Sequence, residues 1–210
     1  MPTSRKDRHL LEAALTNVEV AVDAITSNEA IAAIPVIGTA FKIVKGLDDL
    51  RSRAFAAKLA SFVAEPSLSS AAAKAAIARK ISESPEDARR VGETLFLVLD
   101  RFIDMNKPVI LAKLFVAHLG GQISATDLQR LAQAIDIAFA GDLQALLAAE
   151  ESTVMGLTLY ATNLPWIPTL IPSGLAINTS QGVAVVKTRN EVTPLGQMLW
   201  RAWRYELPEA

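Results

Sequence analysis

The stretch NKPVILAKLFVAHL, residues 106–119, has no polar face and therefore decides where the core of this chain lies. Between Pro108 and His118 its only charge is Lys113. A surface helix keeps a polar stripe, so apolar residues on every side are typical of a helix packed all round by other elements. Pro108 fits the first turn of such a helix and Gly120 fits its end. The sequence predicts a central buried helix over these residues.

Amphipathic patterns predict further helices on both sides of this segment. Ser84 and Pro85 start one of them, with a capping serine, a proline at the first helical position and two acids in the first turn. Its apolar stripe continues through Phe102 to Ile103. Gly141 is the expected hinge between two of the others. The remaining predicted helices cover residues 5–25, 36–64, 70–81, 125–139 and 142–150.

The chain changes in character after residue 150. Three prolines, Pro165, Pro168 and Pro172, argue against helix there. Residues 175–178 and 183–187 are β-prone and predict a hairpin whose turn is residues 179–182. Thr193 and Pro194 then open a last helix. The fold class is therefore mainly α: a helical bundle over residues 1–121 and a winged-helix-like part with one short β-hairpin over residues 122–210, packed together as one unit.

The stretch AIAAIPVIGTAF, residues 30–41, is uncharged and more hydrophobic than a surface helix. It is too short to span a bilayer, which takes about 20 apolar residues. The core, a partner chain or lipid must cover this apolar helical hairpin, and the sequence leaves the three open. Ile34 precedes a proline, which favours an extended turn tip at the surface. The candidate interaction residues here are Ile31, Ile34, Pro35, Val36 and Phe41.

Composition excludes several classes of function. The net charge of −1 gives no overall attraction to nucleic acid or to anionic membranes. Without cysteine there are no disulfides, thiolate metal sites or cysteine nucleophiles. No phosphate-binding loop or metal-ligand spacing is present. We therefore expect no enzyme, no cofactor, no metal and no small-molecule substrate. The N-terminal sequence predicts a cytoplasmic protein, with peripheral membrane association as the alternative.

Two polar residues stand out within apolar segments. His118 lies near the end of the central helix, where the helix dipole favours a partly charged imidazole. We expect a structural role for it. Asp136 interrupts an apolar run, and an unpaired buried carboxylate is costly. It either points outward or pairs with a buried arginine such as Arg101 as a structural contact.

The last predicted helix carries the chain's most interface-like side chains. Trp200, Trp203, Arg204 and Tyr205 belong to the residue types that dominate binding hot spots. The simpler interpretation is that this helix packs onto its own domain. The alternative interpretation is that these four residues form an interaction surface.

The charge distribution argues against nucleic-acid binding, although many winged helices bind DNA. Residues 122–210 contain five basic and eight acidic residues, a net charge of −3. The expected recognition helix, near residues 152–162, has no basic residue. A DNA-binding surface neutralises phosphates with clustered lysine and arginine.

Several short phrases carry a resemblance to other proteins: IPVIGT at 34–39, LDR at 99–101 with KP at 107–108, AIDIAF at 134–139 and VTPLG at 192–196. With the order of elements, they give a chain that resembles an uncharacterised family of mainly helical bacterial proteins with a C-terminal winged-helix-like segment. The resemblance carries no known activity. It implies at most a link to mobile-element or defence functions.

These observations favour a non-enzymatic protein-interaction protein that self-associates or binds a protein partner. The alternative is a conditional membrane-acting protein that inserts residues 30–41 into lipid. A DNA-binding winged-helix regulator is the third possibility.

Overall fold

The structure is a computed structural model, and it describes residues 32–34, 50–156, 164–181 and 187–208. These residues are mainly helical, with one two-stranded antiparallel sheet near the C-terminal end, which confirms the predicted fold class. The predicted helix over residues 5–25 lies outside the described residues, as does the first part of the 36–64 helix. The same holds for four candidate residues, Ile31, Pro35, Val36 and Phe41.

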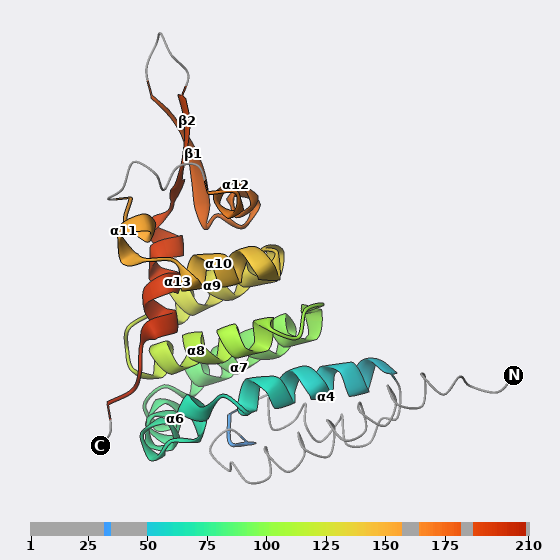
Figure 1. Cartoon of the computed structure of the whole chain (residues 1–210). Helices are drawn as coiled ribbons and strands as arrows, with labels where there is room; N and C mark the ends of the chain where they lie inside the picture. Colours follow the sequence, from blue (N-terminus) through green and yellow to red (C-terminus); the bar gives the residue numbers. More distant parts are fainter. Residues whose placement is uncertain (1–31, 35–49, 157–163, 182–186, 209–210) are drawn as a thin grey trace, which may run out of the picture.

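The predicted central helix is α8 (Lys107–Leu119), and eleven of its 13 residues are buried. Helices from both halves of the chain contact it (Figure 1). They are α4 (Leu50–Val63), α5 (Pro66–Ser69), α6 (Ala71–Glu83), α9 (Ala125–Ile137) and α13 (Pro194–Arg204). One hydrophobic core includes residues of all these helices, so it runs through both predicted parts of the chain. The division at residue 121 stays a prediction.

Capping side chains bond to the backbone at some helix starts and not at others. The Ser70 hydroxyl accepts a hydrogen bond from the Ala73 amide at the start of α6, and Ser124 forms a capping box with Asp127 at the start of α9. α7 (Pro85–Arg101) begins at Pro85 as predicted, but the Ser84 side chain makes no capping hydrogen bond. The Ser84 hydroxyl is therefore left for other contacts.

The helix break near residue 140 is not at the predicted hinge. α9 ends at Ile137, the backbone is extended at Ala138 and Phe139, and α10 (Ala140–Ala148) then begins. Gly141 lies inside the first turn of α10 and has no positive φ. The hinge therefore needs no glycine, because extended backbone is open to any residue.

The prediction that the three prolines prevent helix is wrong. α12 (Trp166–Thr169) contains Pro168, and the 3-10 helix η2 (Ile171–Ser173) contains Pro172. Both prolines fall in the first turn, where an amide has no helical partner and proline costs nothing. Four-residue helices consist of little besides such turns, and α11 (Glu151–Val154) is as short.

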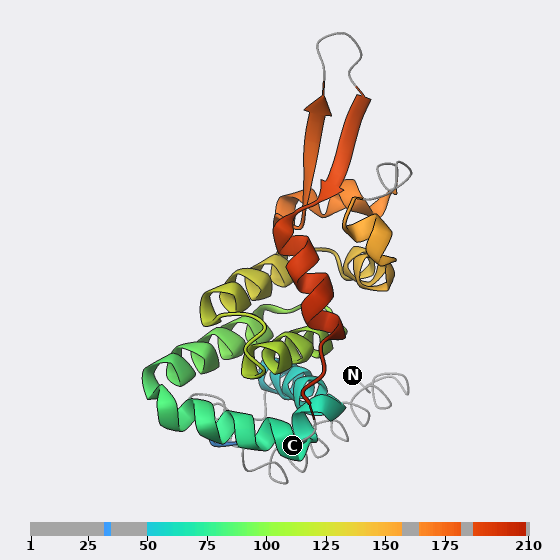
Figure 2. The same ribbon diagram turned by 90° about the vertical axis from the view of Figure 1, so that its left-hand side faces the viewer.

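The β-hairpin exists, but its strands are displaced from the predicted positions. β1 (Ala176–Gln181) pairs with β2 (Lys187–Val192), so three of the four residues expected to form the turn, residues 179–181, belong to the first strand. Gly182 lies outside the described residues. The hairpin projects from the helical body, and α13 leads back from its base to α8 (Figures 1 and 2). Thr193 caps α13 by accepting a hydrogen bond from the Gly196 amide, as predicted.

Candidate functional site

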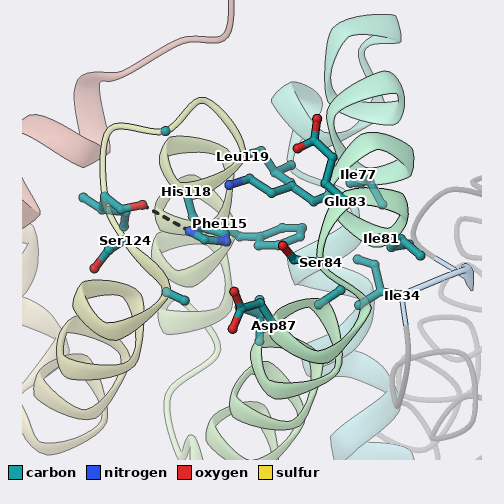
Figure 3. A pocket seen from close by; sticks show the side chains of 16 residues that line it. Ile34, Ile77, Ile81, Glu83, Ser84, Asp87, Phe115, His118, Leu119 and Ser124 are labelled. Atoms are coloured by element: carbon teal, nitrogen blue, oxygen red, sulfur yellow. Dashed lines mark hydrogen bonds between the residues drawn. The ribbon is translucent and has the colours of Figure 1, made fainter.

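A cavity of about 400 Å³ opens between α6, α7, α8 and α9. Its floor is apolar and includes Phe115 and Leu119 of α8 and Ile77 of α6 (Figure 3). His118 is the polar residue set among them, and it is only 8 % exposed. Ile34 completes the wall. A concave, mostly apolar space with a few convergent polar groups is the usual form of a small-molecule site.

The turn after α8 fixes the orientation of the His118 ring. Gly121 adopts a positive φ of 75°, and the chain turns back at this residue toward α8. The Ile123 carbonyl oxygen then lies 3.1 Å from His118 Nδ1. Because a carbonyl only accepts hydrogen bonds, Nδ1 carries the proton, and Nε2 of the neutral ring is an acceptor. Nε2 is turned toward the cavity (Figure 3). The described residues provide no hydrogen-bond partner for it.

Burial keeps His118 neutral, which corrects the expectation of a partly charged ring. Removal from water is the largest cause and lowers the pKa of His118. The hydrogen bond to Ile123 raises this pKa, the Lys80 ammonium lowers it and the Asp87 carboxylate raises it. The structural role expected for His118 agrees with the hydrogen bond of Nδ1 to Ile123. That role does not account for Nε2, which has no hydrogen-bond partner among the described residues.

Charged and hydroxyl groups surround the mouth of the cavity. Lys80 and Glu83 come from the end of α6, and Asp87 comes from the first turn of α7. The hydroxyls are those of Ser84 and Ser124, of which Ser124 is already bonded to Asp127. Arg90 Nη1 lies 3.7 Å from Asp87 Oδ1, so the charges at the mouth balance and give no net attraction to an anionic group.

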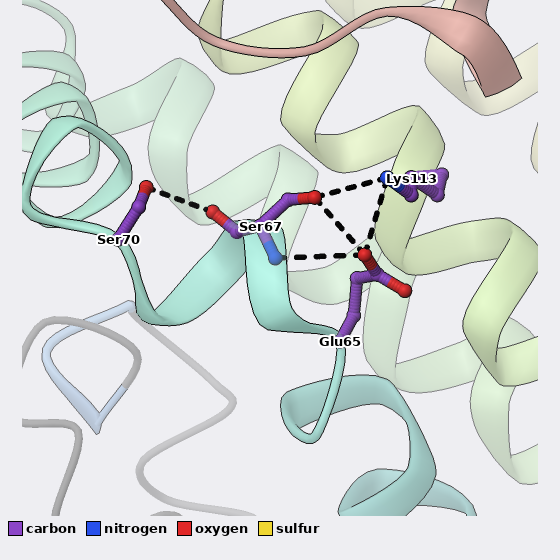
Figure 4. A network of polar contacts seen from close by, with 4 residues as sticks. All are labelled: Glu65, Ser67, Ser70 and Lys113. Atoms are coloured by element: carbon purple, nitrogen blue, oxygen red, sulfur yellow. Dashed lines mark hydrogen bonds and ion pairs between the residues drawn. The ribbon is translucent and has the colours of Figure 1, made fainter. Parts of the chain in front are cut away.

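A second polar cluster joins α8 to the turn between α4 and α6 (Figure 4). Lys113 Nζ lies 3.3 Å from Glu65 Oε1 and donates a 3.0 Å hydrogen bond to Ser67 Oγ, which in turn donates to Glu65 Oε1 at 3.0 Å. A serine beside a lysine can be a nucleophile and its base. Here the ammonium is engaged with a carboxylate and has no lone pair to accept the Ser67 proton. This cluster is therefore a structural contact.

Asp136 forms an ion pair with Arg101, one of the two alternatives left open by the sequence. Asp136 Oδ2 lies 2.6 Å from Arg101 Nη2; the Asp136 side chain is 10 % exposed, and the arginine is largely in solvent. Lys107 Nζ also donates to the Asp136 backbone carbonyl at 2.9 Å. These contacts join the α7–α8 junction to the end of α9.

Large apolar side chains are exposed close in sequence to the two partners of this ion pair. Ile103, in the α7–α8 junction, is 97 % exposed, and Phe139, between α9 and α10, is 72 % exposed. Leu97 lies one helical turn before Arg101, on the same face of α7. We call these residues the junction patch: Leu97, Ile103, Met105, Ile137 and Phe139. Sequence reasoning missed it and placed Ile103 on the inward stripe of α7, which ends at Arg101.

The sequence-predicted interaction residues that the structure describes are mostly packed. Ile34 is 3 % exposed, so the surface turn tip expected there is not observed. Trp200 is buried, its indole N–H donates to the Ala149 carbonyl at 2.9 Å, and the Arg204 guanidinium stacks 3.7 Å from its ring centroid. Trp203 and Tyr205 are half-buried. These contacts agree with the simpler interpretation, packing onto the domain.

Among the described residues, no group of three or more histidine, cysteine or acidic side chains could hold a metal ion. No helix within those ranges has the length and hydrophobicity needed to cross a membrane. Comparison of the chain with protein-family models, with curated proteins and with solved structures finds no match.

Proposed function

We propose that this protein is a non-enzymatic interaction protein that associates with a second copy of itself through the junction patch. The observation that carries the proposal is the exposure of Ile103 and Phe139, which follow the two partners of one ion pair, Arg101 and Asp136, by two and three residues. Single exposed apolar residues are common, but clustered ones mark interaction surfaces. Both junctions lie at the same end of the helical stack (Figure 1).

The structure holds this surface in a fixed shape. Arg101 and Lys107 both contact Asp136, so two chain junctions far apart in sequence are joined at the patch. A preformed surface lowers the ordering cost of association. The exposed apolar side chains therefore extend from a framework that does not need to rearrange.

A second copy suits the charges around the patch. Arg101 is exposed and Asp104 is half-exposed, so both signs are present beside the apolar residues. In a two-fold symmetric interface the patch of one copy faces the same patch of the other copy, which requires a self-complementary surface. The chain's net charge of −1 gives two copies little reason to repel.

Sedimentation velocity of the wild type over a wide concentration range tests the proposal. We expect a dimer that Ile103→Asp and Phe139→Asp convert to a folded monomer, because both side chains are exposed and an aspartate there costs the monomer little. Ile177→Asp is the matched control: Ile177 is an exposed isoleucine on the hairpin, away from the patch, and its variant stays dimeric.

A wild type that remains monomeric at every concentration would contradict self-association. The same samples are then sedimented with anionic lipid vesicles. A monomer that pellets with vesicles, and loses this when Phe139 is changed to Asp, would support membrane association instead.

A further inference from the structure

We propose that the cavity at His118 binds a small, uncharged aromatic molecule that carries an N–H donor. This goes beyond self-association and does not depend on it. It also revises the expectation that the protein takes no small molecule. The geometry that points to it is a buried acceptor nitrogen, turned into a cavity of about 400 Å³, that the described residues do not satisfy.

The acceptor requires a donor on the ligand. His118 Nδ1 is committed to the Ile123 carbonyl oxygen at 3.1 Å, so the ring cannot change tautomer without losing that bond. Nε2 is then a lone-pair acceptor in a place largely removed from water. A buried polar atom without a partner is costly, and a ligand N–H would remove that cost.

The walls require an apolar and planar ligand body. Phe115 stacks against His118 with ring centroids 6.4 Å apart and an interplanar angle of 27°. Ile34, Ile77 and Val91 contribute further apolar surface. Aromatic rings pack well against other rings in offset or tilted arrangements. An aromatic heterocycle therefore suits the walls and the acceptor together.

The mouth of the cavity decides the charge of the ligand. Glu83 and Asp87 lie there with Lys80, and Arg90 Nη1 is 3.7 Å from Asp87 Oδ1, so the charges balance. A carboxylate on the ligand would lose water without a net attraction in return, whereas an uncharged ring meets no such penalty. We therefore assign the site to uncharged molecules rather than to organic anions.

Indole and 1-methylindole are matched probes, since they differ in the one N–H donor. Because the chain has two histidines, nitrogen NMR of the imidazole rings can follow His118 directly. We expect indole to bind with a dissociation constant of about 1 mM, usual for a fragment of its size, and to shift the Nε2 resonance of His118 more than Nδ1. 1-Methylindole should bind about threefold to tenfold more weakly, the worth of one hydrogen bond.

Two variants test the hydrogen-bond acceptor of His118 and the volume of the cavity separately. His118→Phe keeps a planar ring but removes both nitrogens, so the folded variant should lose the preference for indole over 1-methylindole. Ala88→Leu fills part of the cavity from its half-buried wall and should weaken both probes at least tenfold. Ile177→Asp, on the hairpin and outside both the cavity and the junction patch, is the matched control and should bind indole as the wild type does.

Three results would overturn the proposal: no change in the His118 resonances up to the solubility limit of indole, equal affinity for indole and 1-methylindole, or undiminished binding by a folded Ala88→Leu variant. Tighter binding of indole-3-acetate than of indole would overturn the assignment to uncharged ligands. None of these results depends on the oligomeric state of the protein. The proposal of self-association is therefore tested independently of the proposal of ligand binding.

Discussion

Replacing Lys113 with methionine tests how much of the stability depends on the polar cluster beneath α8. Methionine keeps the length and apolar body of the lysine but removes its ammonium. Glu65 then loses its ion-pair partner while its side chain remains only 9 % exposed, and the Ser67 hydroxyl is the main group left to it. The ionised carboxylate must become protonated, draw in water or pull the turn open.

The structure sets the size of this effect. Removal of one partner from a buried ion pair costs about 3–5 kcal/mol. Because the Lys113 side chain is 17 % exposed, water reaches the pair from one side, and we expect a value near 3 kcal/mol. In urea unfolding, with a slope of about 2 kcal/mol per molar, the midpoint should fall by about 1.5 M.

Two controls separate the pair from general damage. Adding Glu65→Gln to Lys113→Met removes the stranded charge and should recover more than half of the loss. Arg89→Met removes an exposed ion pair with Glu93 and should cost less than about 0.5 kcal/mol. A Lys113→Met loss below about 0.5 kcal/mol, or a double variant no better than the single one, would refute the reasoning.

Three further predictions concern the core, the histidine and the hairpin base. Leu114→Ala, in the fully buried centre of α8, should lower the free energy of unfolding by about 2–5 kcal/mol in the same urea assay; a loss under 0.5 kcal/mol would mean that α8 faces solvent. Since the folded state holds the pKa of His118 below its unfolded value of about 6.5, the unfolded chain binds more protons as pH falls below about 7. Stability measured from pH 7.5 to 5.5 should therefore fall with pH in the wild type and fall less in His118→Asn, and parallel slopes would contradict this. Gly196→Ala would place a Cβ 2.4 Å from the Leu175 carbonyl oxygen, which belongs to the backbone and cannot rotate away. The melting temperature should therefore fall by several degrees, and an unchanged value would contradict this close packing.

The sequence predicted best what depends on local chemistry. α8 was found because its residues leave no polar face, and α13 because Thr193 and Pro194 suit the start of a helix. Such features act within a few residues, so no knowledge of the fold is needed to interpret them.

The hairpin shows where local chemistry is insufficient. The residues TSQG at 179–182 resemble a turn, yet β1 continues through Gln181 in register with Lys187 of β2. A two-stranded ribbon that projects from the body buries neither face fully, so polar residues are tolerated along it and the sequence pattern specifies the register weakly. The ladder hydrogen bonds and the side-chain bond from Asn178 to Asn190 hold this register.

The candidate site could not be predicted from the sequence because it depends on how the chain folds back after α8. Sequence alone placed His118 near a helix end, but the Ile123 carbonyl that fixes its ring comes from the turn after Gly121. Likewise, Ile103 continues the apolar stripe of α7 by spacing, and only the end of the helix at Arg101 turns it outward. Periodicity describes a helix and says nothing about the residue after its last turn.

The cavity and the junction patch lie on opposite ends of the same two helices. On α7, Asp87 is at the mouth of the cavity and Arg101 is at the patch, which at about 1.5 Å per residue places them about 20 Å apart. α8 likewise carries His118 at one end and Lys107 at the other. Substitutions this far apart, with no shared partner, normally have additive effects. A variant at the patch that also changed indole binding would therefore mean that α7 and α8 shift together, and that the ligand acts on association through them.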